Sequence, residues 1–385
     1  MSATPPNPAP PAAQLAAKLA ETPLHGWHAA NGGRMVDFAG WSMPVQYGSI
    51  IDEHHATRRD VALFDVSHMG RLEFVGAEAA EFLDRVVTRR VLDMAPGQIR
   101  YGLVCNDAGG ILDDVLVYRL PGDPNLNEDA PTFAMVVNAS NRTKIVTHFK
   151  QYVPHFAVKL LDVTAKTGMI AVQGPRAIEL LDPLVDFELT SLRYYNCRYG
   201  QVAGKSCLVS RTGYTGEDGC ELICEAAAAE HLWTTLLKSG ARPAGLAARD
   251  TLRLEAAMPL YGHELSEAIN PVQAGLSFAL TFADRDFVGR DAILAAKNSG
   301  PSKVRVGLQL EGKRAPREGY RVLQGAEEVG VVTSGTFSPT LEYPIAMALV
   351  KPTAAAIGAK LAVDLRGTEL PAVVTPLPFY QRGAK

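Results

Sequence analysis

One stretch decides the fold of this chain: Gly109-Gly110-Ile111-Leu112-Asp113-Asp114-Val115-Leu116-Val117-Tyr118-Arg119. The paired glycines predict a turn, and the β-branched and aromatic residues after the acids predict a strand. An ionised acid beside buried apolar residues is costly unless it is paired or hydrogen-bonded. The two adjacent acids therefore require partners or a chemical task.

Strand alternation separates these acids. In a regular strand, Asp114 shares a face with Leu116 and Tyr118, while Asp113 points to the opposite face. Both faces are apolar, so the period alone does not decide which acid lies in a site. Either carboxylate remains a candidate at this point.

Strands and helices occur in clusters on both sides of this stretch, without strict βαβ alternation. This order favours an α+β fold with antiparallel pairing. Strands are expected over residues 63–70, 100–105, 115–120, 133–137, 158–163, 169–172, 201–211 and 221–224. Helices are expected over residues 49–59, 76–88, 141–152, 175–181, 226–238 and 247–257.

Composition divides the chain into three parts. Residues 1–21 are rich in Pro and Ala and are expected to form a disordered leader. The run Asn298-Ser299-Gly300-Pro301-Ser302 marks a boundary. We therefore expect one region over residues 22–298 and a C-terminal domain over 299–385. Short, regularly spaced strands predict that the latter is a small antiparallel β-barrel or jelly-roll-like domain.

Charge and cysteine usage exclude several classes of function. The 385 residues have a formal net charge of -3, so no basic excess favours nucleic acid. Five dispersed cysteines without metal-ligand spacing are typical of core thiols in a reducing compartment. No apolar run approaches the ~18 residues of a membrane span. We expect a cytoplasmic protein that spans no membrane.

Metal and phosphate sites are not expected either. His54 and His55 are adjacent and point about 100° apart on a helix, which is not the spacing of a zinc site. The glycine-rich stretch 210–221 lacks the Gly-Lys-Ser/Thr ending of a phosphate loop. It is better explained as a tight loop that aims Tyr214 and Glu221, with a plain glycine-rich hairpin as the alternative.

Several blocks together resemble the T-protein family of the glycine cleavage system, the tetrahydrofolate-dependent aminomethyltransferases. The blocks occur in order and cover nearly all of the chain after the leader. They are Met35–Trp41, Phe64–Gly70, Gly109–Asp114, Val172–Pro175, Ser210–Glu221, Pro243–Asp250, Leu252–Glu255 and Thr333–Thr340.

The resemblance implies a three-domain cloverleaf with folate in its central opening. The implied reaction takes an aminomethyl group from the lipoyl arm of a carrier protein, the H-protein, and passes the one-carbon unit to tetrahydrofolate. Ammonia and the reduced lipoyl arm are the other products. The resemblance implies that Asp114 is the catalytic carboxylate, while Asp113 is expected to hold the turn, with a second active-site role as the alternative.

Further residues match folate-binding positions of the family. The resemblance places Glu221 at the pterin, where a carboxylate can accept hydrogen bonds from a ring N–H and an amino group. Arg249 would bind a carboxylate or carbonyl of folate, with an ion pair to Asp250 or Glu255 as the alternative. For the aromatic residues and the methionine, core packing is the alternative. The remaining implied contacts are Tyr214, Tyr101, Asn138, Met69, Phe278 and Arg382.

Three other functions share parts of this pattern. A related folate-dependent demethylase would use a similar scaffold on a methylated substrate. A non-enzymatic folate-binding protein of iron–sulfur assembly would carry a Lys-Gly-Cys-Tyr-type motif, whereas this chain reads Ser210-Arg211-Thr212-Gly213-Tyr214. A plain binding module is disfavoured by the concentration of matched polar residues.

Overall fold

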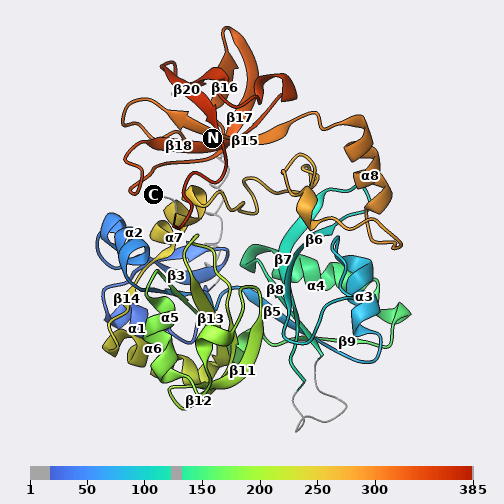
Figure 1. Ribbon diagram of the computed structural model, residues 1–385, viewed down its shortest axis with the longest axis vertical. Helices are drawn as coiled ribbons and strands as arrows, with labels where there is room; N and C mark the ends of the chain where they lie inside the picture. Colours follow the sequence, from blue (N-terminus) through green and yellow to red (C-terminus); the bar gives the residue numbers. More distant parts are fainter. Residues whose placement is uncertain (1–17, 123–131, 384–385) are drawn as a thin grey trace, which may run out of the picture.

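A computed structural model describes residues 18–122 and 132–383. Figure 1 shows three bodies: a barrel at the top, a six-stranded sheet at the lower left and a five-stranded sheet at the lower right. In the described ranges, no helix is long and apolar enough to cross a membrane. The helices are α1 (His25–Ala30), α2 (Ile50–Arg59), α3 (Ala79–Val86), α4 (Arg142–Phe149), α5 (Ala177–Leu181), α6 (Ala229–Lys238), α7 (Leu246–Glu255) and α8 (Arg290–Ser299).

The five-stranded sheet contains the stretch that opened the sequence analysis. Its order is β6-β7-β8-β5-β9, and every neighbouring pair is antiparallel. One face packs on α3 and α4 through a cluster of buried aromatic and aliphatic side chains. The strands are β5 (Gly70–Val75), β6 (Ile99–Cys105), β7 (Ile111–Arg119), β8 (Phe133–Val137) and β9 (Lys159–Asp162).

The six-stranded sheet has the order β11-β12-β13-β10-β4-β14. Its core is centred on Trp233 of α6, which is fully buried. A small sheet of order β1-β3-β2 precedes it in the chain. The strands are β1 (Ala20–Glu21), β2 (Arg34–Phe38), β3 (Trp41–Gln46), β4 (Ala62–Asp65), β10 (Thr167–Gln173), β11 (Cys197–Val202), β12 (Lys205–Ser210), β13 (Gly219–Glu225) and β14 (Arg242–Pro243).

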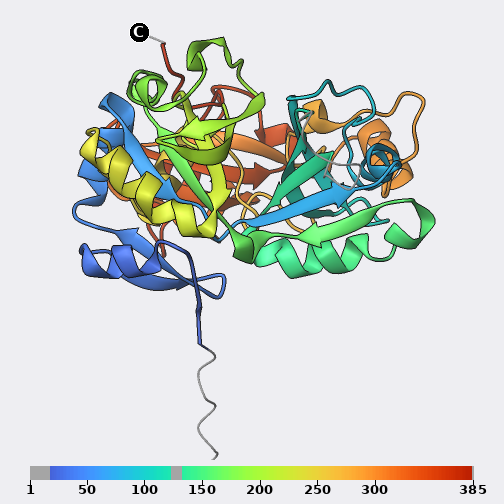
Figure 2. The same ribbon diagram turned by 90° about the horizontal axis from the view of Figure 1, so that it is seen from below.

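The chain crosses between the two large sheets immediately after β4. The expected single strand over residues 63–70 is wrong, because β4 ends at Asp65 and β5 begins at Gly70 in the other sheet. Figure 2 shows β5 in blue beside the green strands of its sheet. The Asp65 Oδ1 accepts a hydrogen bond from the Ser67 N–H at 2.9 Å, which turns the chain at the crossing.

The C-terminal barrel is closed and wholly antiparallel, in the order β15-β18-β17-β16-β19-β20. This confirms the α+β class and the barrel predicted from the sequence. The composition break at residues 298–302 covers the last two residues of α8 and the start of the loop that leads to β15. The strands are β15 (Val304–Leu310), β16 (Arg321–Gln324), β17 (Glu327–Phe337), β18 (Pro344–Val350), β19 (Lys360–Asp364) and β20 (Glu369–Thr375).

A second expected strand also divides in the structure. Residues 201–211 belong to the hairpin β11–β12, whose turn places Ala203 at φ 46° and Gly204 at φ 73°. Ala203 is an uncommon residue for this left-handed conformation, so the sequence carries only the weak turn indication of a single glycine. Residues 1–17 of the expected leader lie outside the described residues, and the last two residues of that leader form strand β1.

One buried guanidinium joins elements from several parts of the chain. Arg58 of α2 donates to Glu217 at 3.0 Å and to Glu255 of α7 at 2.9 Å. It also donates to the carbonyl oxygen of Thr215 at 2.7 Å. The Tyr380 ring lies 4.0 Å from the Arg58 Cζ, so the C-terminal segment covers this cluster.

Glu255 extends the same cluster into the barrel. Its Oε1 accepts hydrogen bonds from the Ser338 hydroxyl and from the Thr340 N–H, the latter at 3.1 Å. His54 lies 3.3 Å from its Oε2. Hydrogen bonds from these groups outweigh the opposing effect of burial and lower the pKa of Glu255 to about 2. The barrel and α7 are thus held together by a fully satisfied, ionised carboxylate.

Replacement of Arg58 should be strongly destabilising. In Arg58→Met the carboxylates of Glu217 and Glu255 lose their shared cation while they remain buried. We expect a loss of about 3–5 kcal/mol in the free energy of unfolding, the usual cost of breaking a buried pair. Urea denaturation measures it, and Arg321→Ala on the exposed barrel surface is the control. A loss below about 1 kcal/mol, the range of an exposed ion pair, would contradict this assignment.

The same cluster makes stability depend on acid. The pKa of Glu255 is lowered in the folded protein, so its contribution is complete above the ordinary carboxyl pKa of 4.5 and is lost as the pH falls towards about 2. We expect Glu255→Gln to be less stable than the parent at neutral pH and to lose less further stability over that window. Urea midpoints measured at a series of pH values test this; parallel curves would be the contrary result.

Candidate functional site

The predicted site residues come from both large sheets and from the segments that connect them. The β6 and β7 strands carry Tyr101 and Asp114, and Asn138 follows β8 directly. From the other sheet, β13 carries Glu221, and Arg249 lies on the adjacent α7. The structure brings these residues together in two linked groups, one around Asp114 and one around Glu221.

Asp113 is fully buried and saturated with hydrogen bonds. Its Oδ2 accepts from the Asn138 N–H at 3.0 Å. Its Oδ1 accepts from the Asn138 Nδ2 at 2.8 Å and from the Asn141 Nδ2 at 2.7 Å. The expectation that Asp113 holds the glycine turn is therefore wrong. Instead, Asn106 accepts the Gly110 N–H at 2.9 Å, and Asp113 anchors the start of the segment that leads into α4.

Asp114 is only half-buried and has fewer donors. Its Oδ1 accepts from the Asn138 Nδ2 at 2.8 Å and its Oδ2 from the Tyr101 hydroxyl at 3.2 Å. As alternation predicts, the neighbours of the two acids divide: Val115 and Val117 pack in one core cluster, Leu116 and Tyr118 in another. The Asn138 amide thus joins two carboxylates that point to different sides of β7.

The two acids titrate as a pair. Burial raises the pKa of both carboxyl groups above the usual value of 3.8, and the negative charge of Asp114 raises the pKa of Asp113 further. Asn138 and Tyr101 act in the opposite direction because they donate to the ionised forms. The result is a carboxylate at Asp114 whose proton affinity exceeds that of an ordinary aspartate.

Glu221 forms the second group with Arg249. The buried Oε2 of Glu221 accepts a hydrogen bond from the Thr212 hydroxyl at 2.5 Å. Burial raises the pKa of Glu221, and the positive charge of Arg249 counteracts part of this rise. The backbone of Ser210 and Glu221 is paired across β12 and β13, so the hydrogen-bonded strands fix where this acid begins.

Arg249 packs over an aromatic ring and forms no ion pair with the part of the chain that the structure describes. Its Cζ lies 4.8 Å from the centroid of the Tyr214 ring, and its buried Nη1 has no hydrogen-bond partner among the described residues. The expected alternative, an ion pair with Asp250 or Glu255, is not formed, since those acids pair with Arg253 and Arg58 respectively. Burial lowers the pKa of Arg249. An unpartnered buried guanidinium can bind an anion or a carbonyl group.

The predicted aromatic residues differ in their surroundings: Tyr214 is held by a hydrogen bond, whereas Phe278 is exposed. The Tyr214 hydroxyl donates to the Pro259 carbonyl oxygen at 2.5 Å, which fixes the tip of the glycine-rich loop. Tyr101 stacks on Phe278 with ring centroids 5.8 Å apart, and Phe278 is 63% exposed. Met69 lies in the crossing between β4 and β5 and packs against a buried cluster that spans both sheets.

Arg382 lies at the end of the described chain. Its guanidinium is 3.5 Å from the Asp218 carboxylate and 5.3 Å from the centroid of the Tyr194 ring. Asp218 is already paired with Arg211 at 2.7 Å, so it neutralises Arg382 only in part. The C-terminal segment therefore returns from the barrel to the loop that carries Tyr214.

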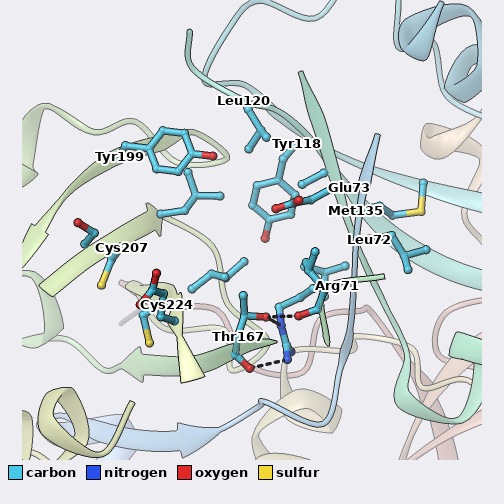
Figure 3. Close-up of a pocket in the computed structure, with 17 residues that line it drawn as sticks. Arg71, Leu72, Glu73, Tyr118, Leu120, Met135, Thr167, Tyr199, Cys207 and Cys224 are labelled. Carbon is cyan, nitrogen blue, oxygen red and sulfur yellow. Dashed lines mark hydrogen bonds between the residues drawn. The ribbon is translucent and has the colours of Figure 1, made fainter. Parts of the chain in front are cut away.

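A cavity of about 380 Å³ adjoins the Asp114 group, and Tyr101 and Phe278 are among its lining residues. A smaller cavity of about 180 Å³ lies between the two sheets (Figure 3) and is lined by Arg71, Tyr118 and Cys224 among others. Arg71 in that cavity is occupied by hydrogen bonds, including one to the Thr167 hydroxyl at 2.6 Å. The larger cavity is therefore the one linked to the candidate site.

Sequence reasoning did not find Thr212, Asn141 or the two tyrosines at 194 and 195. Thr212 donates a hydrogen bond to Glu221, and Asn141 donates one to Asp113. The only indication of these partners in the sequence is that Thr212 lies near Glu221 and Asn141 lies near Asn138. The five cysteines are buried and free. His54 contacts the Thr251 hydroxyl at 2.7 Å and the Thr340 hydroxyl at 2.8 Å. No group of three or more metal-ligating side chains occurs in residues 18–122 and 132–383.

Comparison with known proteins identifies the family of this chain, and two family models together match most of its length. Residues 24–284 match the family described as the GCVT N-terminal domain, and residues 303–381 match the glycine cleavage T-protein C-terminal barrel domain. The chain belongs to the glycine cleavage T-protein family. The resemblance drawn from the sequence blocks is thereby confirmed.

Relatives of this T-protein family member align over nearly their full lengths. A protein named aminomethyltransferase from Geobacillus kaustophilus is 44% identical over 370 residues, which are 94% of this chain and 99% of the relative. One of the same name from Streptomyces coelicolor is 45% identical over 374 residues, or 95% and 98%. The crystal structure of glycine cleavage system aminomethyltransferase T from Bartonella henselae superposes with a TM-score of 0.88 at 32% identity, covering 94% of this chain and 99% of that one.

Asp113 and Asp114 have different environments, so we expect different effects when each is replaced by asparagine. We expect Asp114→Asn to lower kcat by roughly 10²–10⁴-fold, the usual contribution of a general acid or base, and to retain folate binding. Asp113→Asn should retain more turnover but lower thermal stability, because it disturbs a saturated buried carboxylate. Steady-state kinetics and thermal unfolding of both variants measure this. A loss of turnover confined to Asp113→Asn would reverse the assignment.

The pH dependence of the reaction gives a second test of the acid pair. If ionised Asp114 is needed, kcat/KM should fall on the acid side at a pH above the ordinary aspartate pKa of 3.8, since burial raises the pKa of Asp114. In Asp113→Asn this acid limb should stay in place, because the pKa of Asp113 is raised to about 8 and the group is already uncharged where Asp114 titrates. A limb that moves to lower pH in that variant would show instead that Asp113 is ionised where Asp114 titrates.

Proposed function

We propose that the site around Asp114 and Glu221 transfers a one-carbon unit from an aminomethyl-lipoyl carrier protein to tetrahydrofolate, with release of ammonia. Membership of the T-protein family and relatives named aminomethyltransferase make the chain an enzyme, an aminomethyltransferase of the glycine cleavage system. The observation that supports the chemistry best is the raised-pKa carboxylate of Asp114 beside the 380 Å³ cavity.

In the proposed complex, Glu221 receives the pterin. A pterin edge presents a ring N–H beside an amino group, and a carboxylate accepts both in a bidentate pair. The Glu221 Oε2 is held by Thr212 at 2.5 Å, which fixes the plane of the carboxyl group before folate binds. Binding of two donors would compensate the burial that raises the pKa of Glu221 and would favour its ionised form.

Arg249 is the proposed partner of a folate carboxylate or carbonyl oxygen. Its Nη1 is buried without a hydrogen-bond partner among the described residues, and such a group gains a hydrogen bond when an acceptor arrives. Arg382 is the second proposed cation, since Asp218 neutralises it only in part. Tyr214, Met69 and Phe278 are the proposed apolar contacts of the ring system.

The proposed task of Asp114 is to handle a proton or positive charge at the reacting folate nitrogen. When the bond between carbon and sulfur breaks, the carbon acquires iminium-like positive charge, and a nearby carboxylate stabilises it. The same group can accept the proton that the folate nitrogen loses as the new bond forms. Tyr101 and Asn138 hold the two oxygens of Asp114 at 3.2 Å and 2.8 Å, so the carboxylate has a defined orientation.

The proposed partners are tetrahydrofolate and a lipoylated carrier, the H-protein, and the proposed location is the cytoplasm. No metal takes part in the proposed reaction. A folate-dependent demethylase and a folate-binding protein of iron–sulfur assembly are the competing functions. The sequence 210–214 argues against the latter, because it lacks the Lys-Gly-Cys-Tyr-type motif.

The proposal is tested with the purified protein, tetrahydrofolate and an aminomethyl-loaded lipoyl carrier. We expect release of one ammonia per 5,10-methylenetetrahydrofolate formed, and no reaction without either substrate. A parallel reaction contains N-methyl and S-methyl donors in place of the carrier. Turnover with a methyl donor alone would establish the demethylase instead, and folate binding without any turnover would indicate the non-enzymatic protein.

A further inference from the structure

The hydroxyl of Tyr118 is a buried polar group that the proposed reaction does not use. Tyr118 lies on β7, the strand that carries Asp114, and its side chain is fully buried. Its hydroxyl has no hydrogen-bond partner among the described residues. A buried donor without an acceptor is costly, so its presence requires an explanation.

The Tyr118 ring extends from one large sheet to the other. It packs in the apolar cluster that joins the two sheets, together with Leu208 of β12, and Ile223 of β13 packs against the same cluster. Figure 3 shows the ring between strands of the two sheets. The backbone of Tyr118 therefore belongs to the sheet of Asp114, while its side chain packs with the sheet of Glu221.

Strand alternation places Glu221 on the surface that Tyr118 contacts. Side chains two residues apart share a face, so Ser210 lies on the same face of β12 as Leu208. Glu221 lies on the same face of β13 as Ile223 for the same reason. Ser210 and Glu221 are directly paired across the two strands, so both follow the apolar contact of Tyr118 along the sheet.

The acidity of Tyr118 reflects the same neighbours. Burial and the negative charge of Glu221 raise the pKa of Tyr118, whereas the nearby hydroxyls of Ser210 and Thr212 act in the opposite direction. The unpartnered hydroxyl therefore lies close to the group of side chains that holds Glu221.

The hydroxyls around Glu221 have fewer hydrogens than acceptors. Thr212 donates its hydrogen to the Glu221 Oε2 at 2.5 Å, and Ser210 donates to the Glu221 carbonyl oxygen at 3.1 Å. The Ser210 and Thr212 hydroxyl oxygens are also 3.1 Å apart, but each hydroxyl has a single hydrogen. Both oxygens can accept a further hydrogen bond, and a donor to Thr212 would strengthen the bond from Thr212 to Glu221.

We propose that Tyr118 is a positioning residue for folate, whose hydroxyl donates to the Ser210–Thr212 hydroxyl pair in the folate complex and so holds Glu221 ionised and oriented. The inference rests on the proposed function, in which Glu221 accepts the donors of the pterin. Tyr118 touches neither folate nor the reacting atoms and acts through Thr212. Strand β7 then serves both groups of the site, Asp114 in the reaction and Tyr118 in support of Glu221.

The test compares tetrahydrofolate binding to the parent protein and to Tyr118→Phe by anaerobic calorimetric titration. Phenylalanine keeps the ring in the core and removes only the unpartnered hydroxyl, so the variant should fold. We expect its Kd to rise about three- to tenfold at neutral pH, the effect of losing one hydrogen bond. With an aminomethyl-loaded carrier, kcat should stay within about twofold, because the lost interaction concerns binding and the partners of Asp114 are intact.

The pH dependence of folate binding provides a second readout. Hydrogen bonding from Thr212 favours the ionised form of Glu221 against burial, so a weaker bond in Tyr118→Phe should raise the pKa of Glu221. The acid limb of binding should then move to higher pH. Arg249 of α7 also faces Glu221, as do Tyr194 and Tyr195 before β11, and all three are the same in both proteins.

A double-mutant cycle separates this role from a purely structural one. Thr212→Val removes the hydroxyl through which Tyr118 acts and should weaken folate binding by itself. In that background, Tyr118→Phe should change the Kd by less than about twofold, whereas independent effects would add. The control is Tyr152→Phe, at a tyrosine that packs against the helix-side core of the same sheet as Tyr118. It should leave both the Kd and the acid limb unchanged.

The possible outcomes distinguish this inference from the proposed function. An unchanged Kd and acid limb in Tyr118→Phe, or full additivity in the cycle, would overturn the inference alone. A loss of thermal stability in Tyr118→Phe without a shift of the acid limb would assign Tyr118 a structural role and also overturn it. Absence of tetrahydrofolate binding to the parent protein would overturn the proposed function as well.

Discussion

The arrangement of this molecule depends on one buried cluster of charge, the guanidinium of Arg58 between the carboxylates of Glu217 and Glu255. Helix α2, the glycine-rich loop, helix α7, the barrel and the C-terminal segment all contribute to it. Each of the three bodies has its own apolar core, and two further apolar clusters join them, one between the two large sheets and one between the end of α7 and the barrel. The charge-assisted hydrogen bonds of the Arg58 cluster add directional contacts where α2, α7 and the glycine-rich loop meet the barrel.

The site uses the geometry that this junction provides. Asp114 and Glu221 lie on strands of different sheets, and the crossing of the chain between β4 and β5 brings those sheets together. Each acid is oriented by donors from elsewhere in the sequence, Asn138 for Asp114 and Thr212 for Glu221. Burial raises the pKa of both carboxyl groups. In the proposed function, Asp114 exchanges a proton and Glu221 receives the donors of a pterin.

Much of the fold was predictable because its strands carry their own pattern. The barrel strands β15 and β18 appear in the sequence as short apolar runs between turns, and helix α2 begins with Ser49, whose hydroxyl accepts the Asp52 N–H at 3.3 Å. Two of the expected strands are wrong because a strand-like sequence pattern continues across a point where the strand ends. Apolar residues recur through residues 63–70 although the chain changes sheets there, and residues 201–211 contain a hairpin whose turn has an alanine in the left-handed conformation.

The sequence by itself determined that Asp113 and Asp114 face opposite ways, because alternation along a strand is a local property. The family resemblance then selected Asp114, a role that remains a prediction. Only the tertiary structure decided that Asn138 joins both acids, that Arg249 has no ion-pair partner in the described chain, and that Tyr118 packs with the sheet that carries Glu221. These are contacts between segments far apart in the chain, and their distances depend on how separate sheets pack rather than on any local period.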